Sequence, residues 1–502
     1  MNILKNNSTP DILDCIADLS NDEIFTSPKL ANNILDTLPK DLWSNPDTKF
    51  LDPTCKTGVF LREIAKRLNN GLKQKIKDHK KRTNHIFTKQ IFGISITEIT
   101  SLMSRRTLYY SKWASKEKSA CRSFQSDEGN IFYKNYQHKW NKKNICEQCG
   151  AKKNNLNRDV SKESYAYPFL HDIGIFKNMK FDVIIGNPPY QLEDGGFGKS
   201  ASPIYHKFVE HAIRLNPTYL TMIIPARWYS GGKGLDEFRG KMLNDKRIKE
   251  IHDFPETADC FPGQNIRGGV CYFLWDKNHN GKTKVVNYKN SIIVSDLTRD
   301  LKSGGKEIFI RYNKAIDILK KVQDHKEESF DQIVSSRKPF GLPTNFSGFK
   351  NTQSSTYDIM LYRFGDNGYI NSNQVETNRD LINKFKVIVP YASPGGDEFP
   401  HQVLSNPLIS PPKTCSTETY LVIGPYKDKA TCENIKNYMR TKFCRFLILL
   451  IKNTQHVTKK TYSFVPMQNF KENWDDKKLY KKYKITSKEI DFINSLIKPM
   501  NE

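Results

Sequence analysis

Apolar and polar residues alternate in blocks through the first 300 residues of the chain. Short runs of β-branched residues that leave no polar face predict buried strands of a parallel sheet. Longer stretches with apolar residues three and four positions apart predict helices between these strands. We expect strands at 50–52, 90–96, 181–186, 219–224, 249–254 and 269–275, and helices at 22–38, from 58 onward, at 98–109, 203–215 and 234–244. This order predicts an α/β fold with a doubly wound, mostly parallel, Rossmann-like sheet.

Two parts of the chain interrupt this alternation. Residues 111–159 are polar, rich in Lys and Asn, and hold three cysteines, so we expect them to form an insertion in the sheet domain. Beyond residue 300 charged and aromatic residues dominate and turn clusters recur. We therefore expect two domains, 1–300 and 301–502, the second a separate α+β domain. In the second domain the pattern predicts strands at 386–390 and 419–423 and a helix at 430–451.

The chain is strongly basic. Its 502 residues carry 79 Lys and Arg against 54 Asp and Glu, a formal net charge of +25. Aromatic residues make up 12% of the chain, and this mixture of basic and stacking side chains suits nucleic acid better than an acidic membrane surface. The longest strongly apolar run, 446–451, is far shorter than a membrane span, and the amino terminus has no signal-peptide pattern. We expect a cytoplasmic protein with reduced thiols and no membrane partner.

The most informative stretch is residues 182–190, Asp-Val-Ile-Ile-Gly-Asn-Pro-Pro-Tyr. Its three β-branched residues predict a buried strand, and the two prolines must end that strand because they remove two backbone donors and fix φ twice. A rigid loop therefore carries the Asn187 amide, a freed carbonyl and the Tyr190 ring. This loop lies at the carboxyl end of a strand, where open α/β sheets hold their ligands.

The groups on this loop suit a planar substrate that bears an NH₂ group. The lone pair of such an amine, for example adenine N6, is delocalised into the ring, so the amine is a poor nucleophile. The Asn187 side-chain oxygen and the Pro188 carbonyl could each accept one N–H and free the lone pair, while Pro189 stiffens the loop and Tyr190 stacks on the ring. Catalysis would then rest on positioning and electrostatic stabilisation. The simpler alternative is a strand that ends in a Pro-rich turn, with Tyr190 as ordinary cover.

A second loop follows the first predicted strand. Residues 50–61 read Phe-Leu-Asp-Pro-Thr-Cys-Lys-Thr-Gly-Val-Phe-Leu, which predicts a strand that ends at Asp52, a tight turn, and a helix that begins near Gly58. Turns of this kind hold nucleotide-like cofactors at the helix N-terminus. At the switch point of a doubly wound sheet this turn can lie beside the loop of Asn187. We therefore expect the cofactor and the substrate to meet there.

These motifs resemble those of N6-adenine DNA methyltransferases of bacterial restriction–modification systems. Residues 52–60 are similar to the S-adenosylmethionine loop of that family, 187–190 to its catalytic motif, and 25–28, Phe-Thr-Ser-Pro, to its remaining cofactor motif. The order of cofactor motifs, catalysis and target recognition is that of the γ class, and the resemblance covers residues 20–280 well. It implies that S-adenosylmethionine is bound by Phe25, Thr26, Asp52, Pro53, Thr54, Cys55, Gly58 and Asn187.

The resemblance also implies an activity and its partners. We expect methyl transfer from S-adenosylmethionine to a flipped-out adenine in double-stranded DNA, within a restriction–modification or phage-defence system of a bacterium or phage. A base inside a duplex cannot reach a cofactor at a sheet edge, so it must be extruded. The catalytic residues would be Asn187, Pro188, Pro189 and Tyr190, and residues 301–502 would recognise the target. A separate restriction endonuclease or helicase subunit is a further candidate partner.

Two positions depart from the family pattern. The family usually has Gly where this chain has Lys56, and a Gly there allows a tight backbone approach. The family also places an acidic residue at the end of the second strand, to bind the ribose hydroxyls, where this chain has Ser95. Glu98 is the candidate that replaces it. The alternative for Glu98 is an acidic residue in the first turn of a helix, favoured by the helix dipole.

Other functions remain open at this point. The same catalytic motif serves methyltransferases of RNA bases and of protein glutamine, although the basic, aromatic-rich second domain disfavours a protein substrate. A DNA-binding specificity subunit that has lost its activity is the non-enzymatic alternative, and Lys56 and Ser95 favour it slightly.

The insertion carries candidate metal ligands. Cys121, His138, Cys146 and Cys149 lie in a small polar segment without a core of its own, and Cys146 to Gly150 read Cys-x-x-Cys-Gly, a common zinc knuckle. Four N/S ligands in such a segment predict a structural Zn²⁺. A redox pair is a weaker interpretation because no thioredoxin-like βαβ context surrounds the two cysteines. The remaining alternative is three unrelated thiols and a surface histidine.

Overall fold

The computed structural model contains two compact units, Met1–Leu301 and Lys302–Glu502. The domain boundary expected at residue 300 lies one residue before this division. The structure describes residues 24–134, 136–153, 167–171, 179–192, 202–302, 305, 307–393, 400–452 and 455–500.

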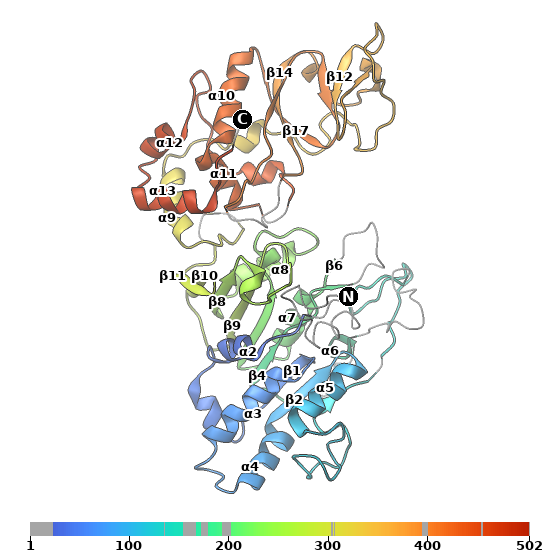
Figure 1. The fold of residues 1–502 in the computed structure, drawn as a ribbon, viewed down its shortest axis with the longest axis vertical. Coiled ribbons are helices and arrows are strands. Elements are labelled where there is room, and N and C mark those ends of the chain that lie inside the picture. Colours follow the sequence, from blue (N-terminus) through green and yellow to red (C-terminus); the bar gives the residue numbers. More distant parts are fainter. Residues whose placement is uncertain are drawn as a thin grey trace, which may run out of the picture. The chain divides into compact units, whose positions relative to one another are not determined.

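The first unit is built on one large sheet (Figure 1). Within the described residues it has nine strands in the order β11-β10-β8-β9-β7-β4-β1-β2-β3. The neighbours from β7 to β3 pair in parallel, as do β8 and β10, whereas β9 and β11 are antiparallel to their partners. This mostly parallel sheet, interleaved with helices, confirms the mixed α/β fold predicted from the alternation of apolar blocks.

All six strands expected in this unit are present, and the first is longer than predicted. The strand that was expected to end at Asp52 runs on to Cys55, because Pro53 and Thr54 keep an extended backbone within the buried sheet. The strands are β1 (Phe50–Cys55), β2 (Ile91–Ser95), β3 (Ile131–Phe132), β4 (Val183–Gly186), β7 (Tyr219–Pro225), β8 (Ile248–Phe254), β9 (Val270–Asp276), β10 (Thr283–Lys289) and β11 (Ile292–Arg299), and a small separate ladder joins β5 (Gln191–Leu192) to β6 (Ser202–Pro203).

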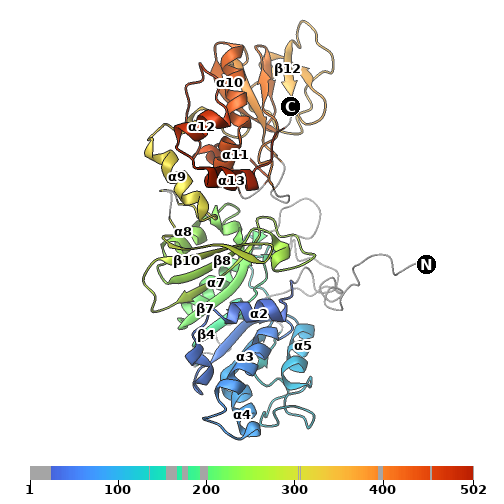
Figure 2. The ribbon, with the colours of Figure 1, turned by 60° about the vertical axis from the view of Figure 1, so that its left-hand side comes forward.

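A helix is present at each of the five places expected in the first unit, and two further α-helices occur among its described residues. The elements are α2 (Pro28–Leu35), α3 (Val59–Gly71), α4 (His79–His85), α5 (Glu98–Tyr109), α6 (Pro168–His171), α7 (Tyr205–Arg214) and α8 (Asp236–Asn244). As predicted, Ser27 caps α2, accepting a hydrogen bond from the Leu30 amide at 3.2 Å, with Pro28 at the first helical position. Helices α2, α3 and α5 gather beside β1 and β2 (Figures 1 and 2), so the turn after β1 lies among them.

The insertion is not wholly separate from the sheet. Its strand β3 pairs with β2, with Ile131 opposite Gly93, and Ala114, Cys121 and Ile131 are buried in the apolar core of the first unit. Among the residues that the structure describes, the stretch 136–153 contains no α-helix or strand; isolated bridges, Trp140 to Cys146 and Ile145 to Lys152, fold it back on itself.

The second unit has two apolar cores and a mixed α+β content. Its described residues form two three-stranded sheets, β13-β12-β16 and β15-β14-β17, and helix α10 packs against the second of them. Its elements are α9 (Lys314–Asp324), β12 (Ile359–Tyr362), β13 (Gly368–Ile370), β14 (Phe385–Pro390), β15 (Leu408–Ser410), β16 (Thr414–Ser416), β17 (Tyr420–Tyr426), α10 (Lys429–Arg440), α11 (Lys442–Leu449), α12 (Asp476–Lys482) and α13 (Ser487–Leu496).

The prediction of a single helix over 430–451 was wrong, because this stretch forms two helices. Thr441 adopts an extended conformation, and its hydroxyl caps α11 by accepting a hydrogen bond from the Cys444 amide at 3.1 Å. A hydroxyl that bonds locally to the backbone competes with helix continuation, so the apolar stretch folds as two helices, α10 and α11. No helix in the described part of the chain has the length and apolar character needed to cross a membrane.

Candidate active site

The loop predicted to carry the chemistry begins where β4 ends. Val183 to Ile185 are fully buried between β1 and β7, with Phe50 and Tyr219 opposite Val183. The strand stops at Gly186, and Asn187 follows with only 3% of its surface exposed. The amide of Asn187 therefore lies at the carboxyl edge of the parallel part of the sheet, as expected.

The Asn187 side chain is bonded through its nitrogen alone. Its Nδ2 donates to the Ile24 carbonyl at 2.9 Å and to the Thr26 hydroxyl at 3.1 Å. Its Oδ1 is buried and accepts no hydrogen bond from the residues that the structure describes. A buried acceptor left in this state costs about 1–3 kcal/mol, so such groups commonly mark a place where a donor binds. The two donated bonds fix the orientation of the amide and leave its oxygen available for a substrate N–H.

The rest of the loop is partly covered. Pro188 is buried, whereas Pro189 and Tyr190 are half-buried, and Tyr190 packs against the apolar core of the first unit. The Tyr190 hydroxyl is buried and has no hydrogen-bond partner among the described residues. Burial raises the pKa of Tyr190 well above its ordinary value, so the phenol stays neutral and offers a flat ring rather than a base.

The end of β1, which leads into the predicted cofactor-binding turn, is in contact with the end of β4, which leads into the Asn187 loop. A Cβ atom on Gly186 would lie 2.8 Å from the Thr54 hydroxyl and 3.1 Å from Asp52 Oδ1. Asp52 Oδ1 accepts the Thr54 amide hydrogen at 3.0 Å. Burial raises the pKa of the Asp52 carboxyl to about 7, against the opposing effects of the Thr54 amide and the Lys56 charge. The absence of a side chain at Gly186 is what allows the ends of β1 and β4 to approach this closely.

The turn itself depends on a glycine and on α5. Gly58 has φ of +76° at the start of α3, and a Cβ there would lie 3.1 Å from the Ser104 backbone. Ser104 Oγ donates to the Lys56 carbonyl at 2.9 Å and lies 3.1 Å from Cys55 Sγ. The sequence analysis did not predict Ser104 at the site. The feature that could have indicated it is a row of small polar residues on the buried side of α5, namely Thr100, Ser101 and Ser104.

Lys56, the first departure from the family pattern, has a definite place. It is 7% exposed, and its Nζ donates to the Ile24 carbonyl at 3.1 Å. The same carbonyl accepts from Asn187. Lys56 and Asn187 thus hold one segment, which also contains the half-buried Phe25 and the buried Thr26. The structure therefore brings together three of the predicted cofactor segments, at 24–26, 52–58 and 187, with Pro53 and Cys55 both buried in the middle one.

Ser95 and Glu98 differ sharply in their surroundings. Ser95 ends β2 opposite Cys55, is fully buried, and its hydroxyl has no partner among the described residues. Glu98 is exposed at the first position of α5, which Thr97 caps. The expected replacement of the ribose-binding acid by Glu98 has no support from its position, which is the one that a helix dipole favours.

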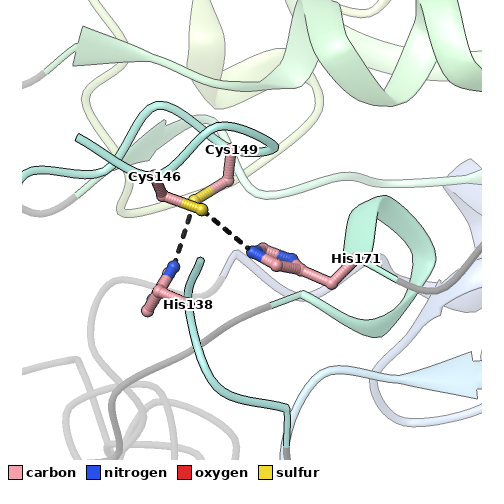
Figure 3. A group of neighbouring side chains, drawn as sticks. All are labelled: His138, Cys146, Cys149 and His171. Carbon is pink, nitrogen blue, oxygen red and sulfur yellow. Dashed lines mark hydrogen bonds between the residues drawn. The ribbon is translucent and has the colours of Figure 1, made fainter. Parts of the chain in front are cut away.

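The predicted metal ligands are only partly brought together. His138, Cys146 and Cys149 converge, and the fourth member of the group is His171 of α6 (Figure 3). Cys121 lies elsewhere, fully buried in the apolar core of the first unit. The expectation that Cys121 completes the set was therefore wrong: an apolar thiol packs well in a core, and His171 lies beyond the segment considered.

The class of protein follows from a relative of known class, and a family model over part of the chain agrees with it. The Eco57I restriction-modification methylase model matches residues 89–261, which contain β2, β4 and the Asn-Pro-Pro-Tyr loop. An adenine-specific methylase of Mycoplasma pneumoniae is 43% identical over 303 residues, 55% of this chain and 72% of that protein. The chain belongs to this family of adenine-specific methylases of the restriction–modification type, which confirms the resemblance found in its motifs.

Restriction–modification enzymes are also among the solved structures that the chain matches. The type IIL enzyme MmeI, solved in complex with DNA, is 13% identical, with a TM-score of 0.49 over 98% of this chain and 76% of that one. The M protein of the type I enzyme EcoKI is 14% identical, with a TM-score of 0.34 over 56% of this chain and 52% of that one. This chain spans about half the length of the EcoKI protein.

Proposed function

We propose that the chain is a site-specific DNA methyltransferase that transfers a methyl group from S-adenosylmethionine to N6 of adenine. The observation that carries the proposal is the Asn187 Oδ1, which is buried at the edge of the sheet and accepts no hydrogen bond from the described residues. Asn187 follows Gly186, which packs against the end of β1. A hydrogen-bond acceptor fixed in this way suits an amine whose N–H must be hydrogen-bonded to free its lone pair for reaction. Family membership supplies the adenine specificity.

The residues present fit the cofactor. Neighbouring atoms approach the backbone closely at Gly58 and Gly186, which border the end of β1 and the turn that follows it. The Ser95 hydroxyl, which has no partner among the described residues, lies opposite Cys55 at the same place. S-adenosylmethionine supplies a methyl group activated by a sulfonium. The Ser95 hydroxyl would bind a cofactor hydroxyl in place of the usual acid, and Asp52 would turn its carboxylate towards the cationic part. Phe25 and Thr26 would close the site, because Lys56 and Asn187 both hold their segment.

The chain's own residues activate the amine by binding it. Asn187 Oδ1 and the Pro188 carbonyl accept the two N–H groups of N6, which localises the lone pair, and the Tyr190 ring stacks on the base. Pro189 keeps the loop rigid, so little reorganisation is needed when the base enters. The neutral Tyr190 phenol does not act as a base, and positioning with electrostatic stabilisation carries the reaction.

The substrate is double-stranded DNA with its target base extruded. The net charge of +25 favours a polyanion, and a flipped base is needed to reach the sheet edge. Residues 302–502, which form a compact unit with cores of their own, would choose the sequence. The protein would act in the cytoplasm within a restriction–modification or phage-defence system, with a separate restriction endonuclease or helicase subunit as a further partner.

Methyl-labelled S-adenosylmethionine tests the proposal with duplex DNA, RNA and protein as parallel substrates. We expect label only in DNA, in adenine. Asn187→Ala should lower the rate by about 10²–10³-fold, the usual cost of one preorganised donor or acceptor at a reacting centre. Gly240→Ala, on α8 with no atom within 4 Å of the added Cβ, is the control that keeps the wild-type rate. Label in RNA or protein would support the second candidate substrates, and no label with intact DNA binding would support the inactive specificity subunit.

A further inference from the structure

Four metal-binding side chains meet outside the active site. His138, Cys146, Cys149 and His171 each offer one ligand atom, and these four atoms all lie within 4.8 Å of one another. Figure 3 shows the two imidazoles pointing at the two thiols, which come from one tight turn. Both cysteines are buried, His171 is only 9% exposed, and His138 is half-buried. The group joins the stretch 136–153 to α6.

The separations suit a tetrahedral metal ion. Cys146 Sγ lies 3.3 Å from His171 Nε2, and Cys149 Sγ lies 3.4 Å from His138 Nδ1. With Zn–S bonds of about 2.3 Å and Zn–N bonds of about 2.0–2.1 Å, two ligands at the tetrahedral angle are about 3.5 Å apart. A thiol–imidazole hydrogen bond would account for either pair alone. It would not account for two pairs that converge on one point.

The surroundings hold the ligands in a binding geometry. His171 Nδ1 lies 2.9 Å from the Tyr167 carbonyl and donates to it, which leaves the lone pair on Nε2 directed at the sulfurs. Gly150 follows the second cysteine with φ of +80°, and its amide donates to the Cys146 carbonyl at 2.9 Å. This turn presents both thiols on the same side, as in zinc knuckles.

We propose that His138, Cys146, Cys149 and His171 bind one structural Zn²⁺. Two sulfur and two nitrogen ligands fill a tetrahedral shell, and a closed shell is typical of structural rather than catalytic zinc. Binding displaces the thiol protons, so two thiolates balance the charge of the ion. The inference rests on the geometry of these four side chains and is independent of the proposed methyl transfer.

The ion would cross-link the stretch 136–153, whose described residues form no α-helix or strand, to α6. Helix α6 is itself anchored by Phe169, whose ring centroid lies 4.6 Å from that of His211 and 6.0 Å from that of Phe208 of α7. Zinc would therefore fasten the loop to α7 through His171. Metal binding to such segments contributes directly to their folding.

Metal analysis of the full-length chain tests the site directly. Protein produced with zinc in the medium should contain one zinc per chain, and replacement by Co²⁺ should give the intense visible bands of tetrahedral cobalt with a thiolate charge-transfer band. Cys149→Ser and His171→Ala should lose the metal. Cys121→Ser, which alters a thiol outside the group, should keep it. His171→Cys should keep one metal per chain and strengthen the charge-transfer band.

Two results would overturn the proposal. One is wild-type protein that neither contains zinc nor binds Co²⁺ tetrahedrally. The other is a Cys121→Ser variant that loses the metal while His171→Ala retains it with an unchanged cobalt spectrum. Because these readouts need no methyl transfer, a failed metal site and a failed enzyme assignment are distinguishable.

Limited proteolysis tests the role of the ion. Lys139, Lys142 and Lys143 are exposed on the loop between the first and second ligands. Removal of zinc by a chelator should speed tryptic cleavage at these lysines by about tenfold or more, the change expected when about 1.4 kcal/mol of local stability is lost. Cleavage in the second unit serves as the internal control. Equal cleavage rates at these lysines with and without zinc would contradict the role assigned to the ion.

Discussion

The contact between the two site loops predicts a large effect of one methyl group. In Gly186→Ala the new Cβ would lie 2.8 Å from the Thr54 hydroxyl and 3.1 Å from Asp52 Oδ1. Overpacking of this kind costs about 1–3 kcal/mol, and the lower chain entropy of alanine returns up to about 1 kcal/mol. We expect a net loss of about 1–2 kcal/mol in the free energy of unfolding of the first unit. Relief of the clash must move Thr54 or Asp52, so the Kd for S-adenosylmethionine should rise about tenfold, which corresponds to about 1.4 kcal/mol.

Urea unfolding and calorimetric titration with S-adenosylmethionine measure these two effects. The matched control is Gly240→Ala, because its Cβ would meet no atom within 4 Å and the residue lies inside α8. That variant should gain about 0.5–1 kcal/mol and bind the cofactor as the wild type does. If Gly186→Ala were as stable as the wild type and bound the cofactor equally well, the argument that a glycine joins the two loops would be refuted.

Three further predictions concern single side chains of the site. Ser95→Ala should raise the cofactor Kd about 2- to 10-fold, the effect of losing one hydrogen bond, while Glu98→Ala should change the Kd less than about twofold. If calorimetry shows the larger effect for Glu98→Ala, the contact with the cofactor hydroxyl belongs to Glu98 and not to Ser95. The pKa of Asp52 is raised from 3.8 to about 7, so the folded state binds its proton more tightly than the unfolded chain does. The stability contributed by that proton is complete below pH 4 and is lost as pH rises to about 7; urea midpoints should show this fall in the wild type and not in Asp52→Asn. Tyr190→Phe should keep the wild-type turnover because the hydroxyl bonds to no described residue. Tyr190→Ala should lose about 10- to 100-fold in kcat/KM, and a wild-type kcat/KM in this variant would exclude stacking on the base.

Much of the sheet domain could be predicted because its signals are local. Val183 to Ile185 have no polar side chain and so predict a fully buried strand. The two prolines after Asn187 cannot donate backbone hydrogen bonds, so the strand must end there. The expected helix at 98–109 matches α5 residue for residue. Loops that follow parallel strands meet at one edge, so the approach of Asp52 and Asn187 could also be inferred.

Other features could not be predicted because they depend on tertiary pairing. The apolar run at 270–276 predicts a buried strand but does not indicate its direction. Nothing local therefore shows that β9 lies antiparallel between β7 and β8. The roles of Lys56 and Ser104 depend on contacts with Ile24 and with the turn after β1.

The metal group illustrates the same limit. Cys121 was predicted as a ligand because it lies within the insertion, whereas His171 lies beyond that segment and was not among the candidates. Only the fold brings His171 of α6 to Cys146 and leaves Cys121 in the core. Spacing identified the two-cysteine turn, and the partner from a different element required the structure.

The most direct test of the account is single-molecule sequencing of DNA from cells that express the wild-type chain or Asn187→Ala. We predict N6-methyladenine at one recurring sequence with the wild type and a much smaller methylated fraction of the same sites with the variant, in line with a rate lowered by about 10²–10³-fold. The purified variant should still bind S-adenosylmethionine within about tenfold of the wild-type Kd, because it loses only two hydrogen bonds to the segment of Ile24 and Thr26. Methylation of these sites to the wild-type fraction in cells that express Asn187→Ala would contradict the role given to its amide oxygen.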